Sequence, residues 1–280
     1  MVATRTSSSN SGTEAIEQLI EMVNDVIESL ADTLDIVDIF ANPNSILVKK
    51  FNEIATVTGP ISDDWYLSFA QLYRLSEDLK EIKISSPSCA GKLKKDLMVQ
   101  KSAVQWHGFR FEARLQARLI EKGFEPKSRE KPDLECEFKG EKLYIEASSA
   151  RYGDSKKALT SPEVKLKTTI RNKNKKPYAN SSTALAIEFS HLLASQEALG
   201  TPIDIQFLKS KLAEQQYKYG AIILIAHIYK NNRYYTLPTV IKSEHCDDKL
   251  SDFLDLVYLS NDSQEKEEFV VGECLPSFEC

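Results

Sequence analysis

Residues 108–148 read GFRFEARLQARLIEKGFEPKSREKPDLECEFKGEKLYIEAS, and this stretch decides the fold. Its first part has apolar residues at helical spacing, which predicts an amphipathic helix that carries Glu112. Its second part alternates apolar and polar residues around a turn at Gly140, which predicts a β-hairpin. The carboxylates of Glu112, Asp133 and Glu146 are therefore expected on a helix and a hairpin that are consecutive along the chain.

The alternation within the hairpin indicates which side chains can meet. Residues two apart on a strand point to the same face of the sheet, so Glu146 and Ser148 share a face. Asp133 opens the first strand and is expected to converge with Glu146 on one cation, aided by a backbone carbonyl such as that of Ala147. Glu112 borders the apolar stripe of its helix, from where it could reach the same ion or a second one. Oxygen ligands of this kind favour Mg²⁺ or Mn²⁺.

These residues, in this order, resemble the PD-(D/E)XK nuclease superfamily, whose fold is called restriction-endonuclease-like. The resemblance covers about residues 95–235: a helix with Glu112, a Pro-Asp strand start at Asp133, a strand with Glu146, a basic helix and an apolar strand. It implies an α/β fold with a mixed sheet flanked by helices. It also implies Mg²⁺-dependent hydrolysis of nucleic-acid phosphodiester bonds, with Asp133 and Glu146 as metal ligands and Glu112 assisting.

Ser148 departs from the family pattern, which has a lysine at this catalytic position. That lysine helps to activate the attacking water and offsets charge that develops on the phosphate, which a serine hydroxyl does not do. The resemblance allows a lysine from elsewhere to take the role. Lys142 is the less favoured candidate, and the others lie on the following helix: Lys165, Lys167, Lys173 and Lys175. Lys167 and Arg171 lie one turn apart and could share a face toward the site.

The charge distribution is that of a protein with a polyanionic partner. Residues 92–131 carry 11 basic and 5 acidic side chains, residues 151–176 carry 9 and 2, and the acidic hairpin lies between them. Lys and Arg bind phosphates, so nucleic acid is the expected partner, with DNA as the expected polymer. The alternative is that both segments are solvated helix faces. Five cations of the second segment are expected to bind nucleic acid: Lys165, Lys167, Arg171, Lys173 and Lys175.

Composition divides the chain into four parts. We expect a disordered tail over 1–12, an acidic helical region over 13–91, the α/β domain over 92–260 and an acidic C-terminal tail over 261–280. In the helical region, helices are expected over 13–40, over 45–56 and from 62 onward, and Ser85–Gly91 is typical of a linker. The α/β domain is expected to hold a helix over 92–122 broken near Trp106–Gly108, strands over 124–127, 133–138, 142–148, 184–189 and 220–229, and helices over 162–176, 203–217 and 248–259.

The cysteines and the lengths of the apolar runs indicate where in the cell the protein is expected. The five cysteines are scattered without a CxxC pair, and the four histidines do not share zinc-ligand spacing with them. This usage predicts a reduced, cytoplasmic protein. No apolar run approaches the roughly 18 residues that span a bilayer, so no membrane contact is expected. A homodimer is compatible with these features of the sequence.

Two other functional classes fit the same sequence. One is a non-catalytic descendant of the nuclease fold that binds nucleic acid or a protein partner and has lost turnover with the lysine. The other is a structural α/β interaction domain whose acidic helices form the partner surface. In these alternatives Glu112 is a surface carboxylate, Asp133 a turn residue and Glu146 a strand-end glutamate that reaches water.

Overall fold

The computed structural model describes residues 10–36, 38–55, 63–99, 103–152, 161–198, 200–201, 203–230, 233–259 and 269–270. Its elements in chain order are α1 (Asn10–Leu34), η1 (Ile39–Ala41), α2 (Ile46–Ala55), α3 (Asp63–Ser85), α4 (Pro87–Val99), α5 (Ala103–Glu121), β1 (Lys127–Ser128), β2 (Leu134–Phe138), β3 (Glu141–Ser149), α6 (Pro162–Lys173), β4 (Thr183–Glu188), α7 (Ser190–Ala198), α8 (Ile205–Ala213), β5 (Ala221–Lys230), β6 (Arg233–Lys242), α9 (Asp248–Leu254), η2 (Asp255–Leu259) and β7 (Phe269–Val270). None of the described helices is long and apolar enough to cross a bilayer.

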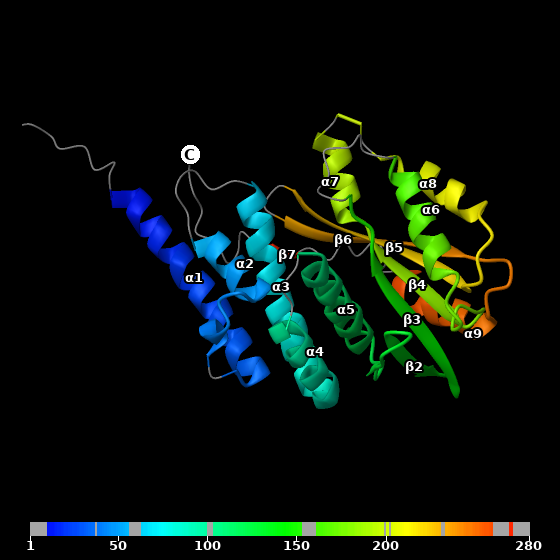
Figure 1. Cartoon of the computed structure of the whole chain (residues 1–280), viewed down its shortest axis with the longest axis horizontal. Helices are drawn as coiled ribbons and strands as arrows, with labels where there is room; N and C mark the ends of the chain where they lie inside the picture. Colours follow the sequence, from blue (N-terminus) through cyan, green and yellow to red (C-terminus); the bar gives the residue numbers. More distant parts are fainter. Residues whose placement is uncertain are drawn as a thin grey trace, which may run out of the picture.

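The described strands form one mixed sheet of seven, in the spatial order β1 to β7 (Figure 1). β2 and β3 form the predicted antiparallel hairpin, with Lys139 and Gly140 both at positive φ in its turn. β3, β4 and β5 are parallel, and β6 returns antiparallel to β5. Helices cross over between the parallel strands, as such connections require. The predicted α/β class, a mixed sheet flanked by helices, is therefore confirmed.

The two faces of the sheet bury separate cores. On the first face, α5 and α9 pack against alternate strand residues such as Leu143, Ile145 and Ala186. On the second face, α6, α7 and α8 pack against the intervening residues, such as Leu185 and Ile187. Alternation along β3 then directs the side chains of residues 144, 146 and 148 to the second face.

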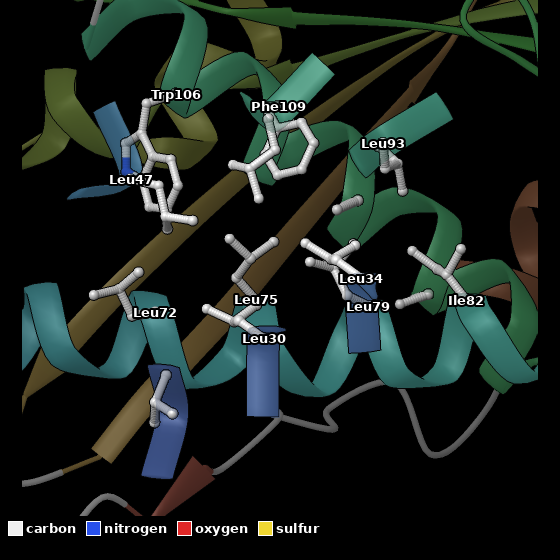
Figure 2. Packing of buried hydrophobic residues seen from close by; sticks show 14 of the residues in the cluster. Leu30, Leu34, Leu47, Leu72, Leu75, Leu79, Ile82, Leu93, Trp106 and Phe109 are labelled. Atoms are coloured by element: carbon white, nitrogen blue, oxygen red, sulfur yellow. The ribbon is translucent and has the colours of Figure 1, made fainter. Parts of the chain in front are cut away.

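A third core lies among α1 to α4 and one face of α5, which carries Trp106, Phe109, Ala113, Ala117 and Ile120. Figure 2 shows Leu30 of α1 and Leu75 of α3 facing Trp106 and Phe109 of α5. Another face of α5, with Phe111, Leu115 and Leu119, packs on the sheet instead. One helix thus contributes to both the helical core and the sheet core.

Several predicted boundaries are wrong. Ser85–Gly91 is not a linker, because α4 begins at Pro87, a residue suited to the first turn of a helix. The helix predicted over 92–122 is instead α4 and α5, and α5 runs unbroken through Trp106–Gly108 because Trp106 is buried in the helical core.

Other differences concern elements that the sequence analysis omits. β6 pairs with β5 over ten residues but holds a proline, which weakens a strand signal. α7 shows little segregation of polar and apolar residues and was also not predicted. Residues 10–12 of the expected tail belong to α1, and 269–270 form β7. Residues 1–9, 261–268 and 271–280 of the two predicted tails lie outside the described residues.

Candidate active site

The hairpin places Asp133 and Glu146 opposite each other. Leu134 of β2 pairs with Ile145 of β3, and the same register carried one residue further sets Asp133 against Glu146. Asp133 Oδ2 accepts a hydrogen bond of 2.7 Å from the backbone N–H of Ala147. The carboxylate of Asp133 is thereby held against β3, beside Glu146.

Lys173 is the cation that reaches this pair. Its Nζ lies 2.5 Å from Glu146 Oε1 and 3.3 Å from the carbonyl oxygen of Ala147. Lys173 ends α6, which is anchored on the sheet by the buried Leu166 and Ile170. Residues 166, 170 and 173 follow an i, i+4, i+7 spacing and share one helix face, which is why this lysine is directed at β3.

The other cations of α6 lie elsewhere. Lys167 pairs with Glu163 at 2.6 Å and shares a face with Arg171, as the sequence indicates. That face lines a groove against α8 and not the Asp133–Glu146 pair. Lys165 is half-buried, and Lys175 is exposed just beyond the helix end. The helix spacing that selects Lys173 was present in the sequence, and it is the signal that could have singled out this residue.

Glu112 lies near the pair, in contact with another lysine. Lys92 Nζ lies 3.2 Å from Glu112 Oε1, and the hydroxyl of Ser128 also donates to that oxygen. Burial raises the pKa of Glu112, and the charge of Lys92 opposes this effect. The charge of Glu112 in turn contributes to the raised pKa of Asp133, so the three predicted carboxylates form one electrostatic group. Lys92 is a member of this group that the sequence analysis missed.

The group holds more negative charge than its cations neutralise. The pKa of Asp133 is raised to about 6. Burial is the largest cause, and the charges of Glu146 and Glu112 act in the same direction, whereas the Ala147 N–H and Lys173 lower the pKa. Glu146 is 3% exposed. Its Oε2 is buried without a hydrogen-bond partner in the described part of the chain. Because an unpaired buried carboxylate oxygen is costly, this atom has the capacity to bind a further cation or proton.

Two tyrosines border the same space. Burial, followed by hydrogen bonding to Glu146 and the charge of Glu146, raises the pKa of Tyr178, whose buried hydroxyl adjoins that carboxylate. The hydroxyl of Tyr219 donates to the carbonyl oxygen of Lys173 and so fixes the end of α6. Ser148 is half-buried on the same sheet face as Glu146, opposite Ile187 of β4. Neither tyrosine is among the site residues predicted from the sequence.

The donor chemistry of the site fits a hard divalent cation. Within the described ranges, no group of three or more His, Cys, Asp or Glu side chains is placed to hold a metal ion. Mg²⁺, however, usually uses only one or two carboxylates and takes its remaining ligands from water and substrate phosphate. Asp133 and the unpartnered Oε2 of Glu146 are suited to that role.

Comparison of the chain with protein-family models, with curated proteins and with solved structures finds no match.

Proposed function

We propose that this chain is a cytoplasmic, Mg²⁺- or Mn²⁺-dependent nuclease-like protein of restriction-endonuclease-like fold that hydrolyses phosphodiester bonds of nucleic acid, DNA first. The observation that carries the proposal is the 2.5 Å contact of Lys173 Nζ with Glu146, beside Asp133. It provides, from the end of α6, the ammonium that the family motif would have at position 148. In this proposal, Lys173 supplies the positive charge that Ser148 lacks.

Each residue has a role that its surroundings support. Asp133 and Glu146 would hold the metal ion, which when bound polarises the phosphodiester and stabilises its developing charge. A pKa of about 6 leaves Asp133 mostly ionised at neutral pH and so able to bind a cation. Lys173 would donate from Nζ to the phosphate or to the attacking water, and Tyr219 keeps it in place. Glu112, balanced by Lys92, adds negative charge at the edge of the site.

The test is cleavage of plasmid, single-stranded DNA and RNA by the full chain, with Mg²⁺, Mn²⁺ or EDTA. Glu146→Gln and Lys173→Met should each lower the rate by about 100-fold or more, the size of effect typical for such groups. Glu188→Gln is the matched control, because Glu188 is an equally buried strand carboxylate that is held by Ser149 and Ser190 instead. Equal cleavage by wild type and Glu146→Gln would exclude the proposal.

A second candidate function is binding of nucleic acid without turnover. It is favoured by the fact that Lys173 Nζ contacts both Glu146 Oε1 and the Ala147 carbonyl, two of the oxygens expected to bind metal. An ion pair there would take the place of a metal ion. Binding of DNA that EDTA leaves unchanged, together with no cleavage in Mg²⁺ or Mn²⁺, would identify this function.

A further inference from the structure

A basic groove lies between α6 and α8, which run side by side on the second face of the sheet (Figure 1). The groove has a volume of about 500 Å³. Its lining includes three cations and one carboxylate: Lys167 and Arg171 of α6, Lys211 of α8 and Glu214 just after it. The excess of positive charge makes the groove complementary to a polyanion.

The cations of the groove are available to a ligand. Arg171 is exposed and has no ion pair among the described residues. Lys167 pairs with Glu163, and Lys211 with Glu214 at 3.1 Å, but both pairs are solvent-accessible. Accessible pairs of this kind contribute little free energy, so phosphate oxygens can replace their carboxylates at small cost.

An exposed aromatic ring lies beside one of these cations, Lys211. Phe207 of α8 is 53% exposed, and Lys211 Nζ lies 5.8 Å from the centre of its ring. The two residues are four apart on α8 and therefore adjacent on its surface. An exposed ring next to a cation is the arrangement that stacks an unpaired base while the cation binds the adjoining phosphate.

The groove and the candidate active site share helix α6, on different faces of that helix. The α6 segment from Val164 to Arg171 spans roughly 10 Å along the helix axis, so its cations can contact more than one phosphate of a strand. Lys173, two residues beyond Arg171, contacts Glu146. A strand in the groove therefore lies along the helix whose end carries the site lysine.

We propose that the α6–α8 groove binds the phosphate backbone of a single-stranded polynucleotide and stacks one of its bases on Phe207. The substrate class of the proposed reaction is then a single strand or a frayed duplex end. The link to cleavage rests on the proposed function, whereas binding in the groove does not.

The test is fluorescence anisotropy with a labelled single-stranded oligothymidine and a duplex of equal length, using the full chain in EDTA. The double variant Arg171→Glu/Lys211→Glu should weaken single-strand binding at least tenfold and reduce its salt dependence. Phe207→Ala should weaken single-strand binding by about fivefold or more and leave duplex binding unchanged. Lys249→Glu is the matched control, an exposed lysine in an ion pair with Glu141 on the opposite face.

Binding by the groove variants at the level of wild type and of Lys249→Glu would overturn the proposal, as would equal losses for Phe207→Ala on both probes. Melting curves that match wild type establish that the variants are folded. The two proposals fail separately. Groove-dependent binding without any cleavage would contradict only the hydrolysis, and cleavage by a chain whose groove variants bind normally would contradict only the groove.

Discussion

Two groups of charged residues differ in the number of cations that face their carboxylates; one joins α3 to α5, and the other lies at the β2–β3 hairpin and the end of α6. In the first, which we call the arginine network, Asp78 and Glu121 are each bonded to both Arg74 and Arg114, at 2.6–3.0 Å. In the second, the candidate active site, Asp133 and Glu146 share one ammonium, that of Lys173.

The two carboxylates of the arginine network differ, because burial raises the pKa of Asp78 in spite of the charges of Arg114 and Arg74. Burial acts to raise the pKa of Glu121, but hydrogen bonds from Arg114 and the charges of Arg114, Arg74 and Arg118 outweigh it and lower the pKa to about 2. At Asp133 burial prevails, and the pKa rises to about 6. Asp78 and Glu121 each contact two arginines, whereas Asp133 and Glu146 lie beside a single lysine. A group left short of cations has capacity for a ligand, which is how perturbed pKa values indicate functional sites.

Removal of Arg114 should have the largest effect on stability. Arg114→Met leaves the buried Asp78 with Arg74 as its remaining arginine partner, which should cost about 3–5 kcal/mol in the free energy of unfolding. Urea denaturation measures the loss. Lys80→Met, which breaks an exposed pair with Glu77, is the control and should change stability by less than about 0.5 kcal/mol. A loss below 1 kcal/mol for Arg114→Met would mean that the arginine network is not structural.

Removal of Lys173 should have a smaller effect, because its side chain is 26% exposed and water can reach the pair. Lys173→Met leaves Glu146 buried beside Asp133 without a cation, at an expected cost of about 2–3 kcal/mol at pH 8. The cost should shrink at pH 5, where one of the carboxylates can bind a proton. Lys175→Met, two residues further on and exposed, serves as control. A pH-independent cost would contradict the assigned charge balance.

Neutralisation of Asp133 should stabilise the protein. Its pKa rises from 3.8 to about 6 on folding, so the folded state binds the extra proton between these values. The contribution of Asp133 to the free energy of unfolding should therefore fall as the pH rises from 4 to 6. Asp133→Asn, which keeps an acceptor for the Ala147 N–H, should remove this slope and gain about 2 kcal/mol at pH 8. Thermal melts in EDTA from pH 4 to 8 measure it. Unchanged stability would contradict an under-neutralised site.

Glu121 should respond to pH in the opposite direction and with the smallest effect. Its pKa falls from 4.5 to about 2 on folding, so its contribution is present above pH 4.5 and is lost as the pH falls toward 2. With 31% of its side chain exposed, solvent screening reduces this contribution to about 1 kcal/mol. Glu121→Gln should show a shallower loss of stability below pH 4.5 in acid titrations followed by circular dichroism. A slope equal to that of wild type would argue against the arginine network as its source.

The sequence predicts the hairpin and the parallel strands well because their signals are local. The alternation around Gly140 and the apolar runs of β4 and β5 depend on neighbouring residues only. The same alternation indicates that Asp133 and Glu146 share a face. The boundary between α4 and α5 was missed because it depends on which side chains the helical core buries, such as Trp106.

Which cations reach the site depends on contacts between residues that are distant in sequence. Lys173 and Glu146 are 27 residues apart, and Lys92 and Glu112 are 20 apart. The choice among the lysines of α6 is made by the helix face that Leu166 and Ile170 bury. This face could be read from spacing alone, whereas the pairing of Lys92 with Glu112 needs the packing of α4 against α5.

The position of α5 between two cores couples them mechanically. Trp106 and Phe109 anchor the helix among α1 to α4, and Phe111 anchors it on the sheet. Glu112 follows Phe111 on this helix and contacts Lys92 of α4. The helical core and the candidate site therefore share α5, so a substitution that disturbs the packing of Trp106 or Phe109 would act on the helix that carries Glu112.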